Sequence, residues 1–511
     1  MTFVALGAGN RQRRRTSSSL LAVLLWLASG PALRAQGAGA GSGGASAGAG
    51  SAGAAAGASG QGAAGAGQAG AHGAAGATNG AQTGAPNETP GGAQAYAAAA
   101  AAGADPRKPP PAKPGALTLE QVVARARANN PTLLAAAANL RSVRAQEIQA
   151  AVRANPYLAV AGADVSEYGS TNGGPTTPYA YSVQVSRLFE RGGKRGIRIQ
   201  NAQDTTAQTS AQLQDNLRQT VLQVRTAFTH MLFAKQSLTL SNAQLVDFRH
   251  EVEIAQDRYK AGDLARLDFE RLDLQLGAFE SDAANDQIAL QQASDQLQTL
   301  IGIATPGTSF DIAGDIVPPL LAETREQLLQ QALNSRPDLA ASQAAVRAAH
   351  SAYELALANG TADPTIEAEY DRTPEIAPFS SNSAGFNVSL PLRIFDRNQG
   401  NKEVARLAIE AAQLTAMATR NQVASDVDQA WVAYVQAKTL SDRFGNHYLD
   451  EATDVLGIAR FAFDHGGLAL IDYLDSLRDS RTSVSDALNA YQQTWIAIHQ
   501  LSESSATELV P

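Results

Sequence analysis

The chain has 511 residues, with 40 lysines and arginines against 48 aspartates and glutamates, a formal net charge of −8 at pH 7 and no cysteine. The negative charge argues against a nucleic-acid-binding protein, which needs a basic face. Without cysteine the chain has no disulfide, no thiolate metal site, no nucleophilic thiol and no lipid-modified amino-terminal cysteine.

Residues 1–35 have the pattern of a secretory signal peptide. Four arginines between Arg11 and Arg15 precede an apolar run from Leu20 to Ala28, and small residues follow. A membrane anchor would need a longer apolar run. In residues 36–116 we expect a disordered leader rich in Gly, Ala and Ser, which is too poor in large apolar side chains to form a core, and then a proline-rich linker.

The rest of the chain contains one unit of roughly 200 residues twice in tandem. Leu188–Arg191 returns as Ile394–Arg397, and Tyr259–Phe269 returns as Phe463–Tyr473. Each unit is predicted to contain a helix, two short strands, a very long helix, a tight turn and a returning helix. The predicted first repeat, inter-repeat linker, second repeat and tail are residues 117–305, 306–325, 326–503 and 504–511.

The first elements of each unit are interrupted by proline. Thr118 can cap a helix that Asn130-Pro131 breaks, because proline disfavours helical geometry in the residue before it, and a second helix is expected from about residue 132 to 154. Arg336-Pro337 repeats this break.

Two strands follow in each unit. They are expected at residues 157–168 and 179–185, and in the second unit at 366–371 and 386–390. Apolar and polar residues alternate along the better-defined strands, which predicts one apolar and one polar face.

Very long helices come next. No proline occurs between Pro178 and Pro306, and none between Pro391 and Pro511. About 65 helical residues form a rod of about 100 Å, and narrow stripes of Leu, Val and Ala favour coiled-coil packing. Each rod is predicted to turn at Gly262 or Gly466-Gly467. A spectrin-like rod would explain these helices but not the four amphipathic strands.

No segment after the leader has the apolar run of a membrane-spanning helix, so a membrane could be crossed only by strands. Four strands cannot close a barrel, and lipid does not tolerate an open sheet edge. Three copies would supply twelve strands. The predicted fold is therefore mainly α with a small β part: a homotrimer with a 12-stranded β-barrel of the outer-membrane type, continued by an α-helical tunnel.

From Leu117 to about Ser502 the chain resembles the TolC-like outer-membrane efflux channel family. The tandem unit, its two X-Pro breaks, the Gly192–Arg195 motif after the second strand and the two Tyr/Phe-x-x-Gly-x-Leu turns carry this resemblance. It implies a passive trimeric duct in the outer membrane that docks onto a periplasmic adaptor (membrane fusion) protein and an inner-membrane pump of the resistance-nodulation-division type.

The segment Leu390–Gly400 most resembles the branch that serves cobalt-zinc-cadmium cation exporters. A multidrug or solvent-efflux duct, a type I protein-secretion duct and a non-porous trimeric coiled-coil scaffold remain as alternatives. Three methionines and seven scattered histidines cannot form a metal cluster, and the chain contains neither a phosphate-binding glycine loop nor His-Glu-x-x-His. We expect no metal site on the chain, no cofactor and no enzymatic activity.

Asp472 and Asp475 are the predicted pore constriction. They lie three residues apart on one helix face, and in a trimer each would form a ring of three carboxylates that attracts cations. The resemblance gives the matching family positions this role, and Asp268 occupies the position of Asp472 in the first repeat. Phe463 and Leu468 stand where the family has a tyrosine and an arginine that hold the closed tip, so this lock must differ. The alternative is an ordinary solvated helix face.

The two helical turns are the predicted adaptor contacts, through Gly262, Leu264, Gly466, Gly467 and Leu468. Glycine permits the turn, and an exposed leucine can fill a pocket of a partner. The alternative is a helix-hairpin cap within the chain.

Acidic and basic residues mark the strand-to-helix junctions. Glu190 and Asp396 are expected to favour the start of the following helix electrostatically. Arg191 and Arg397 are expected to pair with them across the repeat.

Overall fold

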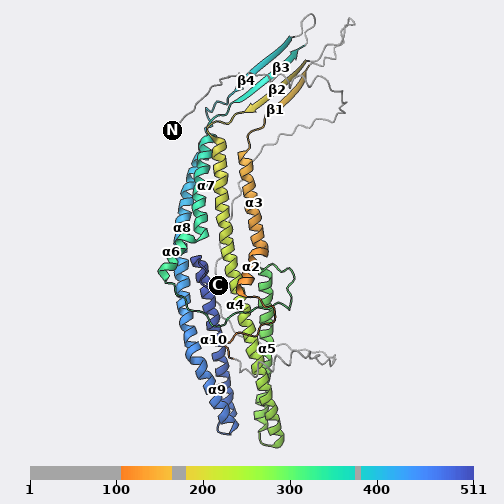
Figure 1. Cartoon of the computed structure of the whole chain (residues 1–511), viewed down its shortest axis with the longest axis vertical. Helices are drawn as coiled ribbons and strands as arrows, with labels where there is room; N and C mark the ends of the chain where they lie inside the picture. The colour runs from red at the N-terminus through yellow and green to blue at the C-terminus, as the bar shows by residue number, and fades with distance from the viewer. Residues whose placement is uncertain (1–104, 164–179, 374–380, 511) are drawn as a thin grey trace, which may run out of the picture. The chain divides into compact units, whose positions relative to one another are not determined.

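The computed structural model describes residues 105–163, 180–373 and 381–510 (Figure 1), all of them within one compact unit, Ala85–Pro511. The predicted signal peptide, the leader up to residue 104 and the predicted loop at residues 169–178 lie outside the described residues.

The four strands form one antiparallel sheet in the order β1-β2-β3-β4, at one end of the helices (Figure 1). β2 of the first repeat pairs with β3 of the second, so both repeats contribute to one sheet. The described part of β1 ends at Ala163, whereas β2 and β4 are longer than predicted. The strands are Tyr157–Ala163, Ala180–Leu188, Thr365–Thr373 and Ser381–Ser389.

The register confirms that the sheet has one apolar and one polar face. Val183 lies opposite Val160 on β1 and opposite Tyr370 on β3, while Gln184 lies opposite Glu369. Because side chains alternate between faces, this pairing keeps carboxylates with amides and hydroxyls across the central strand pair.

The helices of the first repeat are α2, α3, α4 and α5, and those of the second are α6, α7, α8, α9 and α10. α4 has 68 residues, which is a rod of about 100 Å. The neighbouring helices pack in the order α3, α4, α7, α8 along the half nearer the sheet. The bounds are Leu119–Asn129, Pro131–Ala151, Lys194–Ala261, Arg266–Leu300, Arg325–Ser335, Pro337–Asn359, Gln399–Arg443, Leu449–Asp464 and Leu470–Ser505.

The two X-Pro breaks are equivalent joints. The side-chain oxygen of Asn130 accepts hydrogen bonds from the first amides of α3, and its Nδ2 donates to the carbonyl of Leu300, 2.8 Å away. Arg336 donates from Nη1 to the carbonyl of Ser504 at 3.2 Å. Each joint therefore binds the last turn of the returning helix of its own repeat, where carbonyls lack helical partners.

The second rod is not α-helical throughout, which differs from the prediction. A π-helical turn, η1 (Phe444–Tyr448), separates α8 from α9. Its Gly445 packs against Tyr491 of α10 so closely that an added Cβ would lie 2.2 Å from the tyrosine oxygen. Arg107 of the linker donates to the Gly445 carbonyl and pairs with Asp450 at 3.1 Å. Such a turn accommodates one extra residue without ending the helix.

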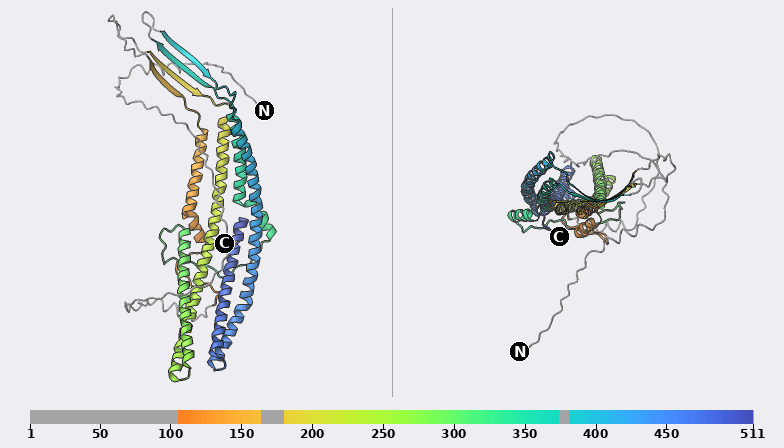
Figure 2. Two further views of the ribbon diagram at one scale, coloured as in Figure 1. Left: turned by 180° about the vertical axis from the view of Figure 1, so that it is seen from behind. Right: turned by 90° about the horizontal axis from the view of Figure 1, so that it is seen from above.

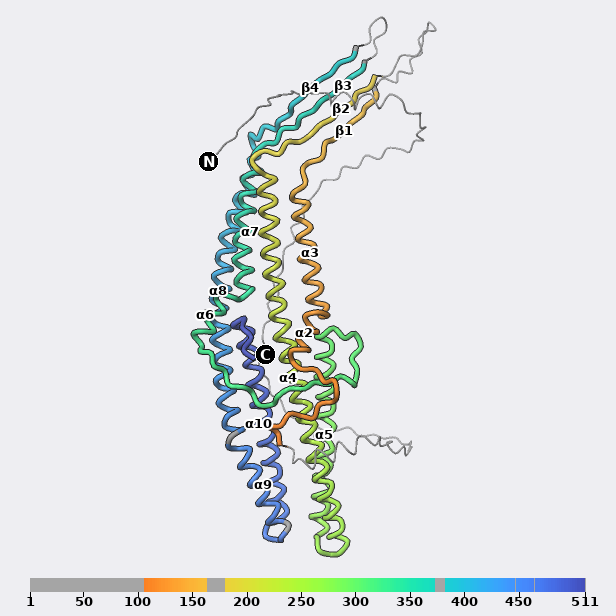
Figure 3. The backbone as a smooth tube through the Cα atoms, in the orientation of Figure 1, coloured from red at the N-terminus to blue at the C-terminus, as the bar shows by residue number. Residues whose placement is uncertain are grey.

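The core consists of three apolar clusters along the rods. One lies around the first joint and one around the second, and the third, the tip cluster, lies between the hairpins α4–α5 and α9–α10. Figure 2 shows these hairpins from behind, and Figure 3 shows the linker before α2 crossing them. No helix among the described residues is both long enough and apolar enough to cross a bilayer. The buried members of the tip cluster are Leu245, Phe248, Val252, Ala255, Leu272, Phe279, Ala283, Ala459, Leu470 and Tyr473.

Candidate functional site: the helical tips and the strand-to-helix junctions

Both predicted turns lie at the ends of the hairpins (Figure 1). Gly262 and Gly466 have φ angles of +87° and +71°, the left-handed conformation that glycine adopts without steric cost. An aromatic pair brackets each turn. The rings of Tyr259 and Phe269 stack with centroids 5.4 Å apart, and those of Phe463 and Tyr473 stack at 5.0 Å.

The leucines of the turns are not fully exposed, which corrects the prediction. Leu264 and Leu468 are half-buried and pack against the tip cluster. More exposed apolar side chains lie elsewhere near the tips, among them Ile458 on α9, which is 70% exposed, and Leu274 on α5, which is 80% exposed. Both leucines therefore contribute to holding their own hairpins, whatever else they contact.

The predicted constriction residues lie on α10 and α5. Asp472 and Asp475 are both exposed, and Asp475 accepts a hydrogen bond from Arg478 one turn later at 3.3 Å. Asp268 is half-buried and lies 3.7 Å from Arg271. Within the described ranges no three histidine or acidic side chains gather in a group able to hold a metal ion.

A polar link that the sequence did not reveal connects the two hairpins. The hydroxyl of Tyr473 on α10 donates to Glu251 on α4 at 2.8 Å, and Arg460 on α9 pairs with the same carboxylate at 3.1 Å. In the sequence, one feature indicated that the hairpins are linked differently: Phe463 and Leu468 replace the tyrosine and the arginine that the family has at these positions.

A second link between the hairpins lies further from the tip along α10 than Tyr473. Arg481 on α10 pairs with Asp282 on α5 and donates to Gln244 on α4 at 3.2 Å. Its guanidinium lies 4.1 Å from the centre of the Phe279 ring, a cation–π arrangement. Arg481 thus joins three helices, and the two links together resist separation of the hairpins.

The strand-to-helix junction of the first repeat binds both repeats together. Lys194 is buried and contacts Asp363 at 2.6 Å and the carbonyl of Thr361 at 2.7 Å, both in the second repeat. The backbone amide of Arg191 donates to the other oxygen of Asp363. A buried ion pair with this many partners specifies the position of one repeat against the other.

Two further arginines of this junction explain why α3 ends before its predicted end. Arg195 and Arg198 donate to the carbonyls of Ala151 and Ala150, the last residues of α3. Glu190 pairs with Arg198 of its own repeat at 2.6 Å, whereas a pairing with Arg397 across the repeat was expected.

The second junction is built around Asn398. Asp396 accepts from the backbone amide of Asn398 at 2.8 Å, next to the start of α8, and the amide of Arg397 donates to Gln399. Asn398 has a φ of +63°, at the place that Gly193 takes before α4, and its side chain donates to the carbonyl of Ala356. Asparagine tolerates this conformation better than other side chains.

The tandem organisation coincides with a known family. Residues 122–303 and 328–504 match the family model described as outer membrane efflux protein. The chain belongs to this family. The resemblance predicted from the repeat, the breaks and the turns is confirmed.

This efflux protein is also similar in sequence to a metal-resistance protein. It is 28% identical over 368 residues to the cobalt-zinc-cadmium resistance protein CzcC of Cupriavidus metallidurans, covering 71% of this chain and 84% of CzcC. This similarity supports the heavy-metal branch. Outer-membrane efflux, which the family description states, is a transport function, in agreement with the prediction of a channel.

Solved structures share the fold of the efflux protein. The CusC channel matches with a TM-score of 0.63 at 18% identity, covering 76% of this chain and 92% of CusC. The open-state MtrE outer membrane channel of Neisseria gonorrhoeae matches with a TM-score of 0.61 at 19% identity, covering 76% of this chain and 89% of MtrE. At these identities the similarity establishes the fold alone.

Proposed function

We propose that this efflux protein forms a homotrimeric passive duct in the outer membrane, continued by a helical tunnel in the periplasm, and that it exports heavy-metal cations. The cations are delivered by an inner-membrane pump of the resistance-nodulation-division type through a periplasmic adaptor protein. Residues 1–35 direct export as a signal peptide, and residues 36–116 act as a leader and linker.

The observation that carries the proposal is the sheet. Among the described residues, the outer edges of β1 and β4 have no partner strand, and both faces of the sheet are solvent-exposed in the single chain. Val160 is 68% and Phe386 is 71% exposed. An uncovered apolar face is unfavourable in water, and open strand edges are unfavourable in lipid. Pairing of β1 with β4 of the next copy closes twelve strands around a polar lumen, with the apolar face toward lipid.

The flanking helices carry complementary exposed apolar stripes. On α8, Val404, Leu407 and Leu414 are exposed at heptad spacing, and on α3, Leu134 and Ile148 are exposed two heptads apart. α3 and α8 lie on opposite sides of α4 and α7 (Figures 1 and 2). A ring of copies that packs α3 of one against α8 of the next buries both stripes, and such head-to-tail contacts close into a cyclic trimer.

The tips provide the second part of the proposal. Rings formed by Asp472, Asp475 and Asp268 line the periplasmic mouth and favour cations. The turns at Gly262 and Gly466 contact the adaptor. CzcC is named for resistance to cobalt, zinc and cadmium, which supports a divalent cation as the cargo.

Single-channel recording in a planar bilayer tests the proposal. We expect small cation-selective currents, and we expect Asp472→Ala/Asp475→Ala to reduce cation selectivity and widen the mouth. Asp257→Ala, which removes an exposed carboxylate of α4, is the matched control. Absence of current from verified inserted trimers would support the non-porous scaffold.

Cargo is tested separately in cells that lack the gene. Loss of tolerance to zinc, cobalt and cadmium, restored by the wild-type chain, is the expected result. Loss of tolerance to drugs or loss of protein secretion, with metal tolerance intact, would contradict heavy-metal export and favour the other ducts.

A further inference from the structure

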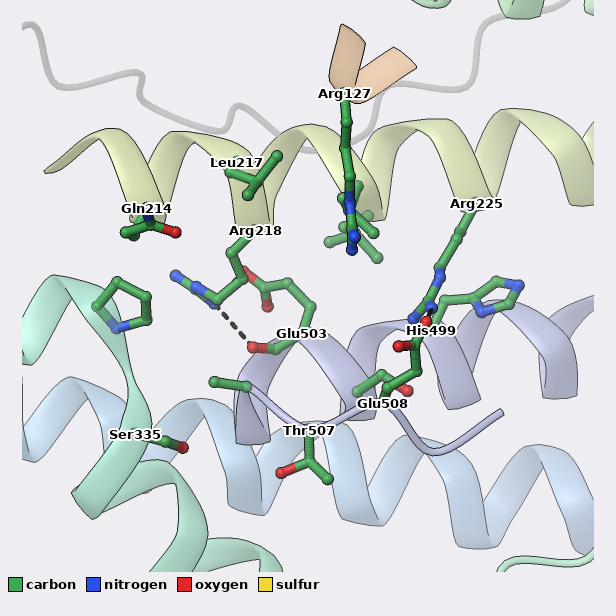
Figure 4. Close-up of a pocket in the computed structure, with 15 residues that line it drawn as sticks. Arg127, Gln214, Leu217, Arg218, Arg225, Ser335, His499, Glu503, Thr507 and Glu508 are labelled. Carbon is green, nitrogen blue, oxygen red and sulfur yellow. Dashed lines mark hydrogen bonds and ion pairs between the residues drawn. The ribbon is translucent and has the colours of Figure 1, made fainter. Parts of the chain in front are cut away.

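A cavity of about 280 Å³, open to solvent and lined by charged, polar and apolar side chains, lies between α2, α4, α6, the start of α7, α10 and the chain after α10 (Figure 4). This is roughly nine times the ~30 Å³ that a water molecule occupies in the liquid. Three arginines approach it, Arg127 from α2 and Arg218 and Arg225 from α4, while Glu503 and Glu508 approach from α10 and the tail (Figure 4). None of the roles proposed above uses this cavity.

Two buried groups at the cavity have unused hydrogen-bonding capacity. Arg225 is 6% exposed; it donates from Nη2 to Glu508, but its buried Nε has no acceptor among the described residues. His499 is 2% exposed, and its Nδ1 likewise has no partner in the described part of the chain. A buried donor without an acceptor is unfavourable by about 1–3 kcal/mol.

The imidazole of His499 is a neutral donor here. Burial, with a smaller contribution from Arg225, lowers the pKa of His499 to about 3. Nε2 lies 3.1 Å from the hydroxyl of Thr229. In the tautomer in which Nε2 accepts from this hydroxyl, Nδ1 carries the proton and needs an acceptor.

The carboxylates at the cavity are unevenly distributed among its three arginines. Arg218 is paired with both Asp215 and Glu503. Arg127 is exposed, and no carboxylate of the described residues pairs with it, although it is close enough to Arg225 to lower the pKa of that guanidinium, which burial lowers most. Arg225 pairs with Glu508 alone, and Arg127 lies nearby without a carboxylate of its own in the described part of the chain.

The partner of Arg225 is loosely held. The side chain of Glu508 is 59% exposed whereas that of Arg225 is 7% exposed. Releasing Glu508 to water therefore loses little burial, while Arg225 would be left without a counter-charge unless another anion replaced it. A metal cation is disfavoured at this place by the two guanidinium groups.

We propose that this cavity is a binding site for a small oxyanion, a phosphate or a carboxylate, held between Arg127 and Arg225 in place of Glu508. Planar guanidinium groups bind both oxyanions bidentately. The Nε–H of Arg225 supplies a donor that Glu508 leaves unused. Binding of the anion displaces the side chain of Glu508 into solvent, so that the ligand and the Glu508 carboxylate exclude each other at Arg225.

Isothermal titration of inorganic phosphate into the purified full chain in detergent tests the proposal, with chloride adjusted to constant ionic strength. Glu508→Gln removes the competitor, and we expect it to bind phosphate about tenfold more tightly than the wild type. Arg127→Gln should bind about tenfold more weakly, the loss expected for a charge-assisted hydrogen bond. Arg125→Gln removes an exposed charge from the same helix outside the cavity and should match the wild type.

Acetate, titrated in a parallel series, defines the ligand class. Saturable binding of both anions supports a general oxyanion site, and binding of phosphate alone supports a phosphate site. Absence of saturable binding of either anion to Glu508→Gln overturns the proposal. Equal phosphate affinity of Arg127→Gln and the wild type also overturns it, because Arg127 is exposed and its replacement does not threaten folding.

Discussion

Replacing His499 by Gln should make the folded protein less sensitive to mild acid. His499 is buried in α10, and burial lowers its pKa from 6.5 to about 3. At a pH between these two pKa values the unfolded chain therefore binds one more proton than the folded chain. Because stability rises with pH wherever the unfolded state binds more protons, stability is lost as the pH falls below 6.5.

The magnitude follows from the two pKa values. At pH 5 the unfolded imidazole is almost fully protonated and the folded one is neutral, so His499 destabilises each chain by about 2 kcal/mol relative to pH 7, at 1.36 kcal/mol per pKa unit. This figure hardly depends on the folded pKa while that value stays below about 4. Burial raises the pKa of Glu503, one turn along α10. This shift makes the folded protein more stable as the pH falls, which is opposite to the effect of His499. It is present in both proteins, so it largely cancels in the difference between their free energies of unfolding.

The assay is urea unfolding of the detergent-solubilised protein at pH 7 and pH 5, monitored by circular dichroism. The wild type should lose about 2 kcal/mol more per chain than His499→Gln over this interval. Gln can still accept the hydrogen bond from Thr229, which limits other changes. His250→Gln, which removes an exposed imidazole on α4, should behave as the wild type. Equal pH dependence of the wild type and His499→Gln would refute the assignment of a buried, neutral imidazole.

Arg481→Gln breaks the link between α10, α5 and α4, and we expect a larger single-channel conductance and more frequent opening. Lys438→Gln, whose partner Asp442 lies on its own helix α8, should change neither. Unchanged gating in Arg481→Gln would remove this link from the closed state. Lys194→Met leaves a mostly buried carboxylate unpaired at the repeat junction and should lower the free energy of unfolding by about 3–5 kcal/mol, as measured in urea; a loss below 1 kcal/mol would contradict a structural role. Gly445→Ala forces a methyl group against the phenolic hydroxyl oxygen of Tyr491 and should destabilise the protein by about 1–3 kcal/mol. Adding Tyr491→Phe should restore part of this loss, and no restoration would place the strain elsewhere.

The elements that could be predicted depend on neighbours within the chain. Asn130-Pro131 and Arg336-Pro337 end helices because proline restricts the preceding residue, and the structure has a helix boundary at both places. Alternation along the strands assigned their two faces correctly, because the side-chain period of a strand is two. The turn at Gly262 followed from the first glycine after Gly196 in a long helical stretch.

Errors arose where a distant contact decided the outcome. The π-helical turn at Phe444–Tyr448 has no proline before it, and it depends on Tyr491 and Arg107 packing against Gly445. The α3 helix ends early because Arg195 reaches back to its last carbonyls across the intervening strands. The residues that bridge the hairpins were missed for the same reason.

The sequence by itself determined the tandem repeat, the order of helices and strands, and the family, since all three are recorded in periodicity, in glycine and proline positions and in motifs that recur along the chain. Only the tertiary structure decided which charges meet. Lys194 forms an ion pair with Asp363, Arg481 forms one with Asp282, and Arg225 lies beside His499 and Glu508. These partners lie between 169 and 283 positions apart, and the energy of a charge depends on its burial and on its nearest neighbours in space, which sequence spacing does not specify.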